Sequence, residues 1–300
     1  MKDANEGKLC LPDFQRDFVW PRELVADLVR SILRRYYLGS LLLLRCERDR
    51  PPFAPVFLRG AKPLYREPSP ELLVLDGQQR LTALLYALTA PDLPLKDSKR
   101  HRHFFVNLKI LLEDPDNDEI VFDLPKDDLD GYDHPEVQYE RRTIPCVALF
   151  DTGASTKWLR GLRKWLEKEK PAEHAEFEAS DEVRLSQIFN DFANFEVPLV
   201  ELPKVEESDP RSIGRVRAIF EKLNSTGVEL SVYDLLTARL YRSGIRLHQL
   251  WDRACQENKL LMEWSGGKAD QNKFGVLILR TLALRRGLEV RASMLIDLVG

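Results

Sequence analysis

The segment Leu72-Leu73-Val74-Leu75-Asp76-Gly77-Gln78-Gln79-Arg80 decides the first half of the fold. The four consecutive apolar residues 72–75 are typical of a buried strand, and the run ends abruptly at Asp76-Gly77. From Gln78 to Leu88 the leucines repeat at helical spacing, so we expect a helix directly after the glycine. A strand that enters a helix through one glycine aims the free N–H groups and the positive dipole end of that helix at one point. Such a point binds phosphate.

Each residue of this turn has chemistry that suits a phosphate. Gly77 lets the backbone come close, and Gln78 and Gln79 supply amide donors. Arg80 supplies a planar guanidinium that matches phosphate oxygens. Asp76 is a candidate ligand for a Mg²⁺ that accompanies the phosphates. A second interpretation needs no ligand, since Asp76 as N-cap with Gln79 three residues later approximates a capping box.

Two further segments place polar residues at helix ends. Gln15 and Arg16 precede the helix that begins after Trp20, where a cation is electrostatically misplaced unless an anion lies nearby. An ion pair with a neighbouring aspartate is the alternative explanation for Arg16. Asn224 to Gly227 forms a polar, glycine-closed turn that could bind a nucleotide or could only cap the helix before it.

The remaining pattern predicts an α/β (α+β) fold. Apolar runs predict strands at 40–44, 104–111, 119–124, 143–149 and 196–202, and helical spacing predicts helices at 21–37, 157–170 and 182–195. After residue 150 the sequence is mostly of a helix-forming type, so we expect two domains. Residues 1–150 contain the strands, and residues 151–300 are mostly helical. A helical pattern at 292–299 reaches the last residue, which suggests either a fragment of a longer protein or the partner of a separate subunit.

Bulk charge and apolar content exclude several classes of protein. A net charge of −3 and an estimated pI of 6.1 give no global attraction to DNA. Any DNA contact must come from a local patch, for which the arginines between residues 30 and 50 are the candidate, a solvated helix face being the alternative. The arginines in question are Arg30, Arg34, Arg35, Arg45, Arg48 and Arg50. No apolar run is long enough for a membrane span and no secretory signal is visible, so a cytoplasmic protein is expected.

Motifs for other chemistries are missing from the sequence. The four cysteines form no C-x-x-C pair, and the acidic turn 114–118 lacks the glycine and the glutamate of a calcium loop. Neither a G-x-x-x-x-G-K-[ST] nor a G-x-G-x-x-G motif is present, so a P-loop or Rossmann protein is not expected.

Three segments, taken together, resemble a known family. They are Leu11 to Trp20 with Ser31-Ile32 and Gly39-Ser40, then Val74 to Leu84, and then Phe220 to Gly227 with Leu230. In order and spacing they resemble the DGQQR-motif N-terminal domain of GmrSD-type modification-dependent restriction endonucleases and of the SspE and BrxU phage-defence proteins. The resemblance covers residues 9–240 and implies a ParB/sulfiredoxin-like fold for the first half.

The resemblance also implies a nucleoside triphosphate, with Mg²⁺, bound and hydrolysed at the DGQQR turn. Carried over by position, the nucleotide site consists of Asp76, Gly77, Gln78, Gln79 and Arg80, with Gln15 and Arg16 as a second wall. Asp76, Gln79 and Arg80 become the candidate catalytic residues, and Asp76 the metal ligand. Asn224 and Gly227 match the helix-end motif of the family.

The implied partners are DNA, modified or from phage, and an HNH-type nuclease domain or subunit. Family members that cut DNA continue into an HNH-type domain, and no nuclease centre is expected within these 300 residues. The function indicated is therefore a nucleotide-hydrolysing regulatory domain of a restriction system. A DNA-binding module without turnover and a purely structural partner subunit are the alternatives.

Overall fold

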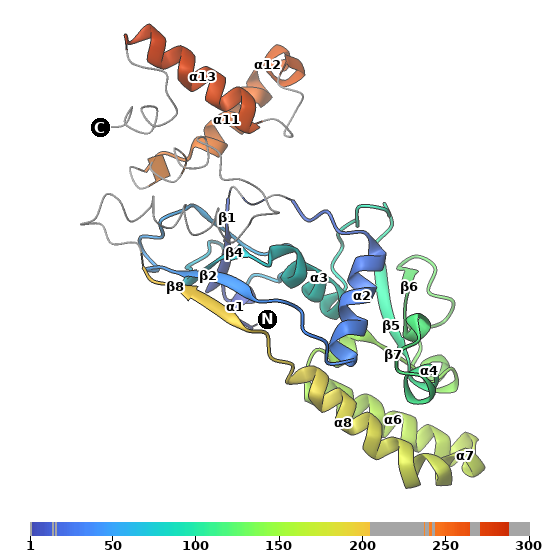
Figure 1. Ribbon diagram of the computed structural model, residues 1–300. Coiled ribbons are helices and arrows are strands. Elements are labelled where there is room, and N and C mark those ends of the chain that lie inside the picture. Colours follow the sequence, from blue (N-terminus) through green and yellow to red (C-terminus); the bar gives the residue numbers. More distant parts are fainter. Residues whose placement is uncertain are drawn as a thin grey trace.

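The computed structural model describes residues 2–13, 15, 17–204, 237, 240–241, 244–264 and 271–287. Its first sheet has the strand order β3-β1-β4-β2-β8 (Figure 1). The strands are β1 (Leu9–Pro12), β2 (Leu41–Arg45), β3 (Pro55–Val56), β4 (Leu72–Asp76) and β8 (Leu199–Leu202). A second, antiparallel sheet has the order β6-β5-β7, formed by β5 (Arg102–Asn107), β6 (Val121–Pro125) and β7 (Thr143–Pro145).

The predicted central strand is confirmed as β4. It runs parallel to β1 and antiparallel to β2, and its residues 73–75 are buried. Continuous leucine and valine therefore serve a strand that is covered on both faces. The predicted strand at 40–44 is confirmed as β2, and its Leu42 lies opposite Asp76, which brings the end of β4 beside the start of β2.

Helices α2 (Arg22–Leu33) and α3 (Gln78–Thr89) lie side by side between the two sheets (Figure 1). Leu85 of α3 packs with Leu43 and Val74 of the first sheet. Ala83 and Tyr86 of the same helix belong to the larger apolar cluster beside the second sheet. A helix that buries two faces in this way fixes the position of its N-terminus relative to both sheets.

The remaining helical segments are short, apart from a long pair after β7 and two helices near the end. They are α1 (Lys2–Asn5), α4 (Leu108–Glu113), η1 (Asp118–Ile120), α5 (Pro135–Glu140), η2 (Cys146–Leu149), α6 (Thr152–Glu169), α7 (Pro171–Glu176), η3 (Phe177–Asp181), α8 (Glu182–Ala193), α11 (Leu247–Glu257), α12 (Lys259–Trp264) and α13 (Gln271–Arg285). The mixed helix and strand content confirms the predicted α/β (α+β) class. Among the described residues, no helix is both long and apolar enough to cross a membrane.

Two predicted strands end earlier than the sequence pattern suggested. The strand predicted at 104–111 ends at Asn107, whose side chain accepts hydrogen bonds from the backbone N–H groups of Lys109 and Ile110 and so begins α4. The strand predicted at 143–149 ends at Pro145 and continues as the 3₁₀ turn η2, which buries Leu149. The sequence pattern predicted correctly that these apolar residues belong to the core, but it predicted strand where the structure has helix.

The division predicted near residue 150 stays a prediction, and the packing crosses it. Leu162 and Leu166 of α6 share one apolar cluster with Val29 of α2 and Phe104 of β5. The strand predicted at 196–202 is confirmed as β8, and it pairs in parallel with β2 of the first sheet. Residues from both sides of position 150 therefore build the same core and the same sheet.

Candidate functional site

Gly77 forms the turn between β4 and α3. Its φ of +94° lies in the left-handed region, which favours glycine. A Cβ at this position would stand 2.2 Å from Cδ2 of Leu41. Glycine is therefore required twice, once by the backbone conformation and once by the close approach of β2.

The first turn of α3 is not closed by a capping box. Gly77 is the N-cap residue, and no side chain caps this helix end within the described part of the chain. The alternative in which Asp76 caps and Gln79 completes the box is thus wrong, because the turn ends one residue later than that scheme requires. The first backbone N–H groups and the positive dipole end of a 12-residue helix consequently meet no capping carboxylate.

Gln79 fastens the turn to the segment that precedes α2. Its amide oxygen accepts from the backbone N–H of Val19 at 3.0 Å, and its amide nitrogen donates to the carbonyl of Asp17 at 3.0 Å. The side chain is 8% exposed. Gln15 makes a matching contact, since its amide nitrogen donates to the carbonyl of Leu75 at 2.9 Å. Gln15 therefore lies against the turn, where the sequence predicted a second wall.

Arg80 joins the turn to residues 38–40, which connect α2 to β2. Its Nη2 donates to the carbonyl of Ser40 at 2.8 Å, and its Nη1 donates to the carbonyl of Leu38. Gly39 lies beneath the guanidinium, with a φ of +80°, and a Cβ there would stand 2.7 Å from Nη1. The glycine is thus explained by Arg80, which lies 41 positions away in the sequence and was not paired with it in the sequence analysis.

Asp76 is the acidic residue of the turn, and its carboxylate is accessible to solvent. Its side chain is 47% exposed, and one carboxylate oxygen lies 3.4 Å from Nη2 of Arg80, whose own side chain is 24% exposed. Gln78, by contrast, is buried. A Mg²⁺ that arrives with a triphosphate needs only one or two protein carboxylates, because phosphate oxygens and water complete its shell. The single half-exposed carboxylate of Asp76 fits that mode of binding.

Three predicted site residues lie outside the described residues. They are Arg16 in the second wall and Asn224 and Gly227 in the helix-end turn. Their predicted roles stay predictions.

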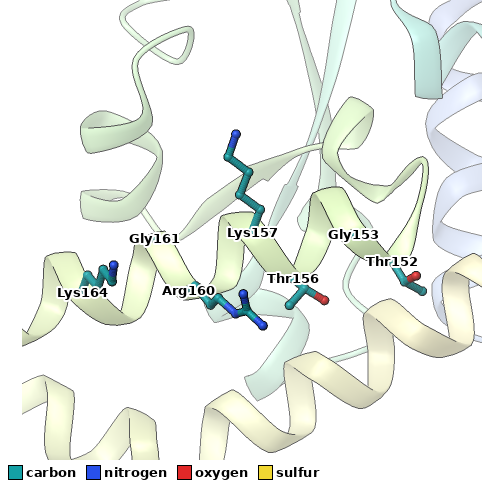
Figure 2. A pocket seen from close by; sticks show the side chains of 7 residues that line it. All are labelled: Thr152, Gly153, Thr156, Lys157, Arg160, Gly161 and Lys164. Carbon is teal, nitrogen blue, oxygen red and sulfur yellow. The ribbon is translucent and has the colours of Figure 1, made fainter.

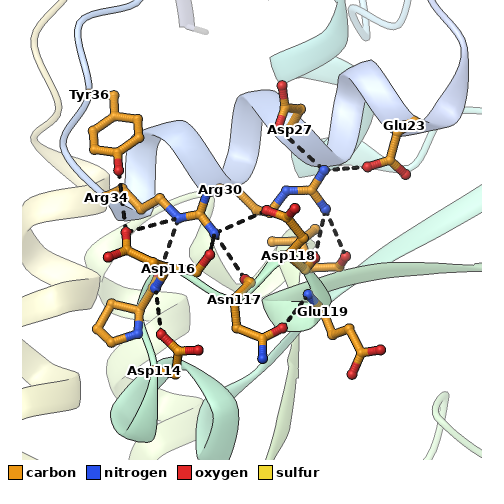
Figure 3. A network of polar contacts seen from close by, with 12 residues as sticks. Glu23, Asp27, Arg30, Arg34, Tyr36, Asp114, Asp116, Asn117, Asp118 and Glu119 are labelled. Atoms are coloured by element: carbon orange, nitrogen blue, oxygen red, sulfur yellow. Dashed lines mark hydrogen bonds and ion pairs between the residues drawn. The ribbon is translucent and has the colours of Figure 1, made fainter.

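The arginines proposed as a DNA patch are used inside the protein. Arg30 is 4% exposed, donates to the carbonyls of Asp118 and Val121, and pairs with Glu23 and Asp27 (Figure 3). Arg34 donates to three backbone carbonyls of the acidic turn 115–117, as Figure 3 also shows. The turn that resembled a calcium loop is therefore held by Arg30 of α2 and by Arg34, the residue that follows this helix.

Three other members of that patch are paired as well. Arg35 pairs with Asp191, Arg45 with Glu201 and Arg48 with Glu71. The interpretation of residues 30–50 as a free cationic surface is therefore not supported.

Histidines and acids form no metal centre in the described part of the chain, where no group of three or more His, Cys, Asp or Glu is placed to hold an ion. His101 lies 3.1 Å from a carboxylate oxygen of Asp92. Burial lowers the pKa of His103, with a smaller lowering by Lys126 and an opposing effect of Asp92. The two histidines of His101-x-His103 thus occupy different surroundings.

Comparison with known proteins identifies the family of this chain. Residues 1–241 match the model of the family described as GmrSD restriction endonuclease, N-terminal domain. The chain is also 32% identical over 314 residues to the uncharacterized protein MJ0686 of Methanocaldococcus jannaschii, an alignment that covers 99% of this chain and 50% of that relative. The chain therefore spans about half the length of the curated relative it matches. The protein belongs to the GmrSD restriction endonuclease N-terminal domain family.

Proposed function

We propose that this chain is the nucleoside triphosphate-binding and hydrolysing regulatory domain of a DNA restriction system. The observation that carries the proposal is the start of α3, where Gly77 leaves a 12-residue helix without a side-chain cap, next to the half-exposed Asp76. Backbone N–H groups at such a helix end suit a phosphate group. The restriction family to which the chain belongs supplies the biological setting.

The residues of the turn divide into two kinds of role. Backbone N–H groups at the start of α3 hold the phosphates, and Asp76 contributes a ligand to the accompanying Mg²⁺. Arg80 neutralises charge that develops on the transferred phosphoryl group. Both polar ends of the Gln79 amide are used on Asp17 and Val19, so we assign Gln79 to positioning rather than to activating the attacking water.

Arg80 also offers a route by which a bound phosphate is sensed. The same guanidinium that faces Asp76 donates to the carbonyls of Leu38 and Ser40. A phosphate that attracts this guanidinium competes with those carbonyls for its N–H groups. Occupancy of the turn is thereby coupled to the 38–40 segment. Cleavage of modified or phage DNA is assigned to an HNH-type nuclease on another domain or subunit.

A thermal-shift screen with each of the four triphosphates and Mg²⁺ tests binding. A ligand at 100 times its Kd stabilises the folded state by about 2.7 kcal/mol, so a true ligand gives a clear rise in Tm. Phosphate release then measures hydrolysis for any triphosphate that binds. The absence of a shift for all four triphosphates contradicts the proposal.

Asp76→Asn tests the metal ligand with little change of shape. We expect this variant to keep its Tm without ligand and to lose Mg²⁺-dependent phosphate release. Asp133→Asn is the matched control, because Asp133 is an exposed aspartate paired only with its neighbour His134 in the described part of the chain. Unchanged turnover in Asp76→Asn removes Asp76 from the site.

A further inference from the structure

Helix α6 carries a cationic face that the nucleotide proposal does not use. Lys157, Arg160 and Lys164 follow one another at i, i+3 and i+7, which places them on one side of the helix. They line a hollow of about 540 Å³, and Figure 2 shows their side chains along α6. The other lining residues are Thr152, Gly153, Thr156 and Gly161.

These three cations differ from their neighbours in having no acidic partner among the residues that the structure describes. Arg163, on the same helix, pairs with Glu178 and Glu182, and Lys168 pairs with Glu169. Within the described part of the chain, no ion pair or hydrogen bond is found for the side chains of the three face residues. Their charge is therefore available to an external anion.

The helix that carries this face is held firmly in the protein. Buried residues on the opposite side of α6, among them Trp158 and Leu162, hold the helix in the core. The hydroxyl of Tyr139 packs against Gly161, where a Cβ would stand only 2.0 Å from it. The lining residues other than the three cations are glycine and threonine, which add no bulky side chain to the hollow.

The lining chemistry favours a phosphate backbone over a protein partner. Protein interfaces are anchored by buried aromatic or aliphatic side chains, and this hollow is lined by none. The three cations extend over about 10 Å of helix, from the rise of about 1.5 Å per residue. Duplex DNA carries one negative charge for about every 1.7 Å of its axis, so several phosphates lie within reach of this span.

We propose that the α6 face, defined by Lys157, Arg160 and Lys164, binds the phosphate backbone of duplex DNA. This proposal rests on the place of the chain in a DNA restriction system, but it requires neither nucleotide binding nor turnover. The binding is independent of sequence, since phosphate contacts carry no base information. The face positions DNA while a nuclease on another domain or subunit cuts it.

The test compares two triple variants of the full chain. K157Q/R160Q/K164Q removes the three positive charges of the α6 face. K62Q/K96Q/K109Q removes the same number of charges from three exposed lysines elsewhere in the chain, which also lack an acidic partner among the described residues. Fluorescence anisotropy with an unmodified 30-base-pair duplex, without nucleotide, gives Kd at salt concentrations from 50 to 200 mM. Thermal melting of both variants verifies that they remain folded.

Counterion release sets the expected size of the effect. Each phosphate contact contributes a slope of about 0.9 to the fall of log affinity with log salt, so three contacts contribute about 2.7. The wild type should lose about 40-fold in affinity over this fourfold salt range from these contacts alone. The face variant should bind weakly with that slope removed, and the control should keep both affinity and slope.

Three outcomes overturn the proposal. They are equal losses in the two triple variants, a wild-type affinity that does not change with salt, and DNA binding that poly-glutamate displaces as readily as a second duplex does. None of these outcomes concerns phosphate release, which is measured without DNA. Failure of the α6 face is therefore distinguishable from failure of the nucleotide site.

Discussion

Replacement of Gly77 by alanine tests the double requirement for glycine at the β4–α3 turn. The left-handed φ of +94° costs an L-residue about 1–2 kcal/mol. The new Cβ also meets Cδ2 of Leu41 at 2.2 Å, and overpacking of this kind costs about 1–3 kcal/mol. Together these effects predict that the free energy of unfolding falls by about 2–5 kcal/mol.

Urea unfolding of the wild type and four variants separates the two contributions. Gly131→Ala is the matched control, because Gly131 has a φ of +80° but its Cβ would stand 3.4 Å from Val137, an ordinary contact. It should lose only the conformational part, about 1–2 kcal/mol. In a Leu41→Ala background the clash is relieved, so Gly77→Ala should cost about 1–3 kcal/mol less there. Equal costs of Gly77→Ala with and without Leu41 would refute the packing argument.

Two further predictions concern the stability contributed by a buried arginine of α2 and by a histidine of the second sheet. Arg30→Met should lower the free energy of unfolding by about 2–4 kcal/mol, because the carbonyl of Asp118 loses a buried charged donor. Arg48→Met breaks only an exposed ion pair, so it should lower the free energy of unfolding by at most about 1 kcal/mol in the same urea assay. The lowered pKa of His103 means that the unfolded state binds a proton more readily than the folded state. Stability should therefore fall as the pH drops below the ordinary value of 6.5, and His103→Gln should flatten that dependence in urea titrations between about pH 5 and 8; identical pH profiles would count against it.

The turn itself was predictable because its signals are local. An apolar run, one glycine and a leucine repeat lie within 17 residues, and together they specify strand, turn and helix without knowledge of any partner. The limit between β5 and α4 also had a local signal, Asn107 as N-cap, which the continuous apolar pattern obscured. A period error of this kind arises wherever a buried strand leads straight into a buried helix.

The side-chain contacts of the site could not be predicted from the sequence. Gln79 was assigned to the ligand because its partners, the backbone groups of Asp17 and Val19, become neighbours only when α2 packs on α3. The dependence of Gly39 on Arg80 has the same origin. Arginine-rich segments look cationic in sequence, but their free charge depends on acids as distant as Glu201, which pairs with Arg45 across 156 positions.

The parallel pairing of β8 with β2 has a consequence for biosynthesis. During translation Leu41–Arg45 leaves the ribosome long before Leu199–Leu202 is synthesised. Chain synthesis proceeds at about 5–20 residues per second. For roughly ten seconds or more the polypeptide therefore holds an apolar, unpaired strand edge. The helices α6 and α8 are synthesised before this edge is covered, so we expect the nascent chain to be prone to aggregation until β8 is complete.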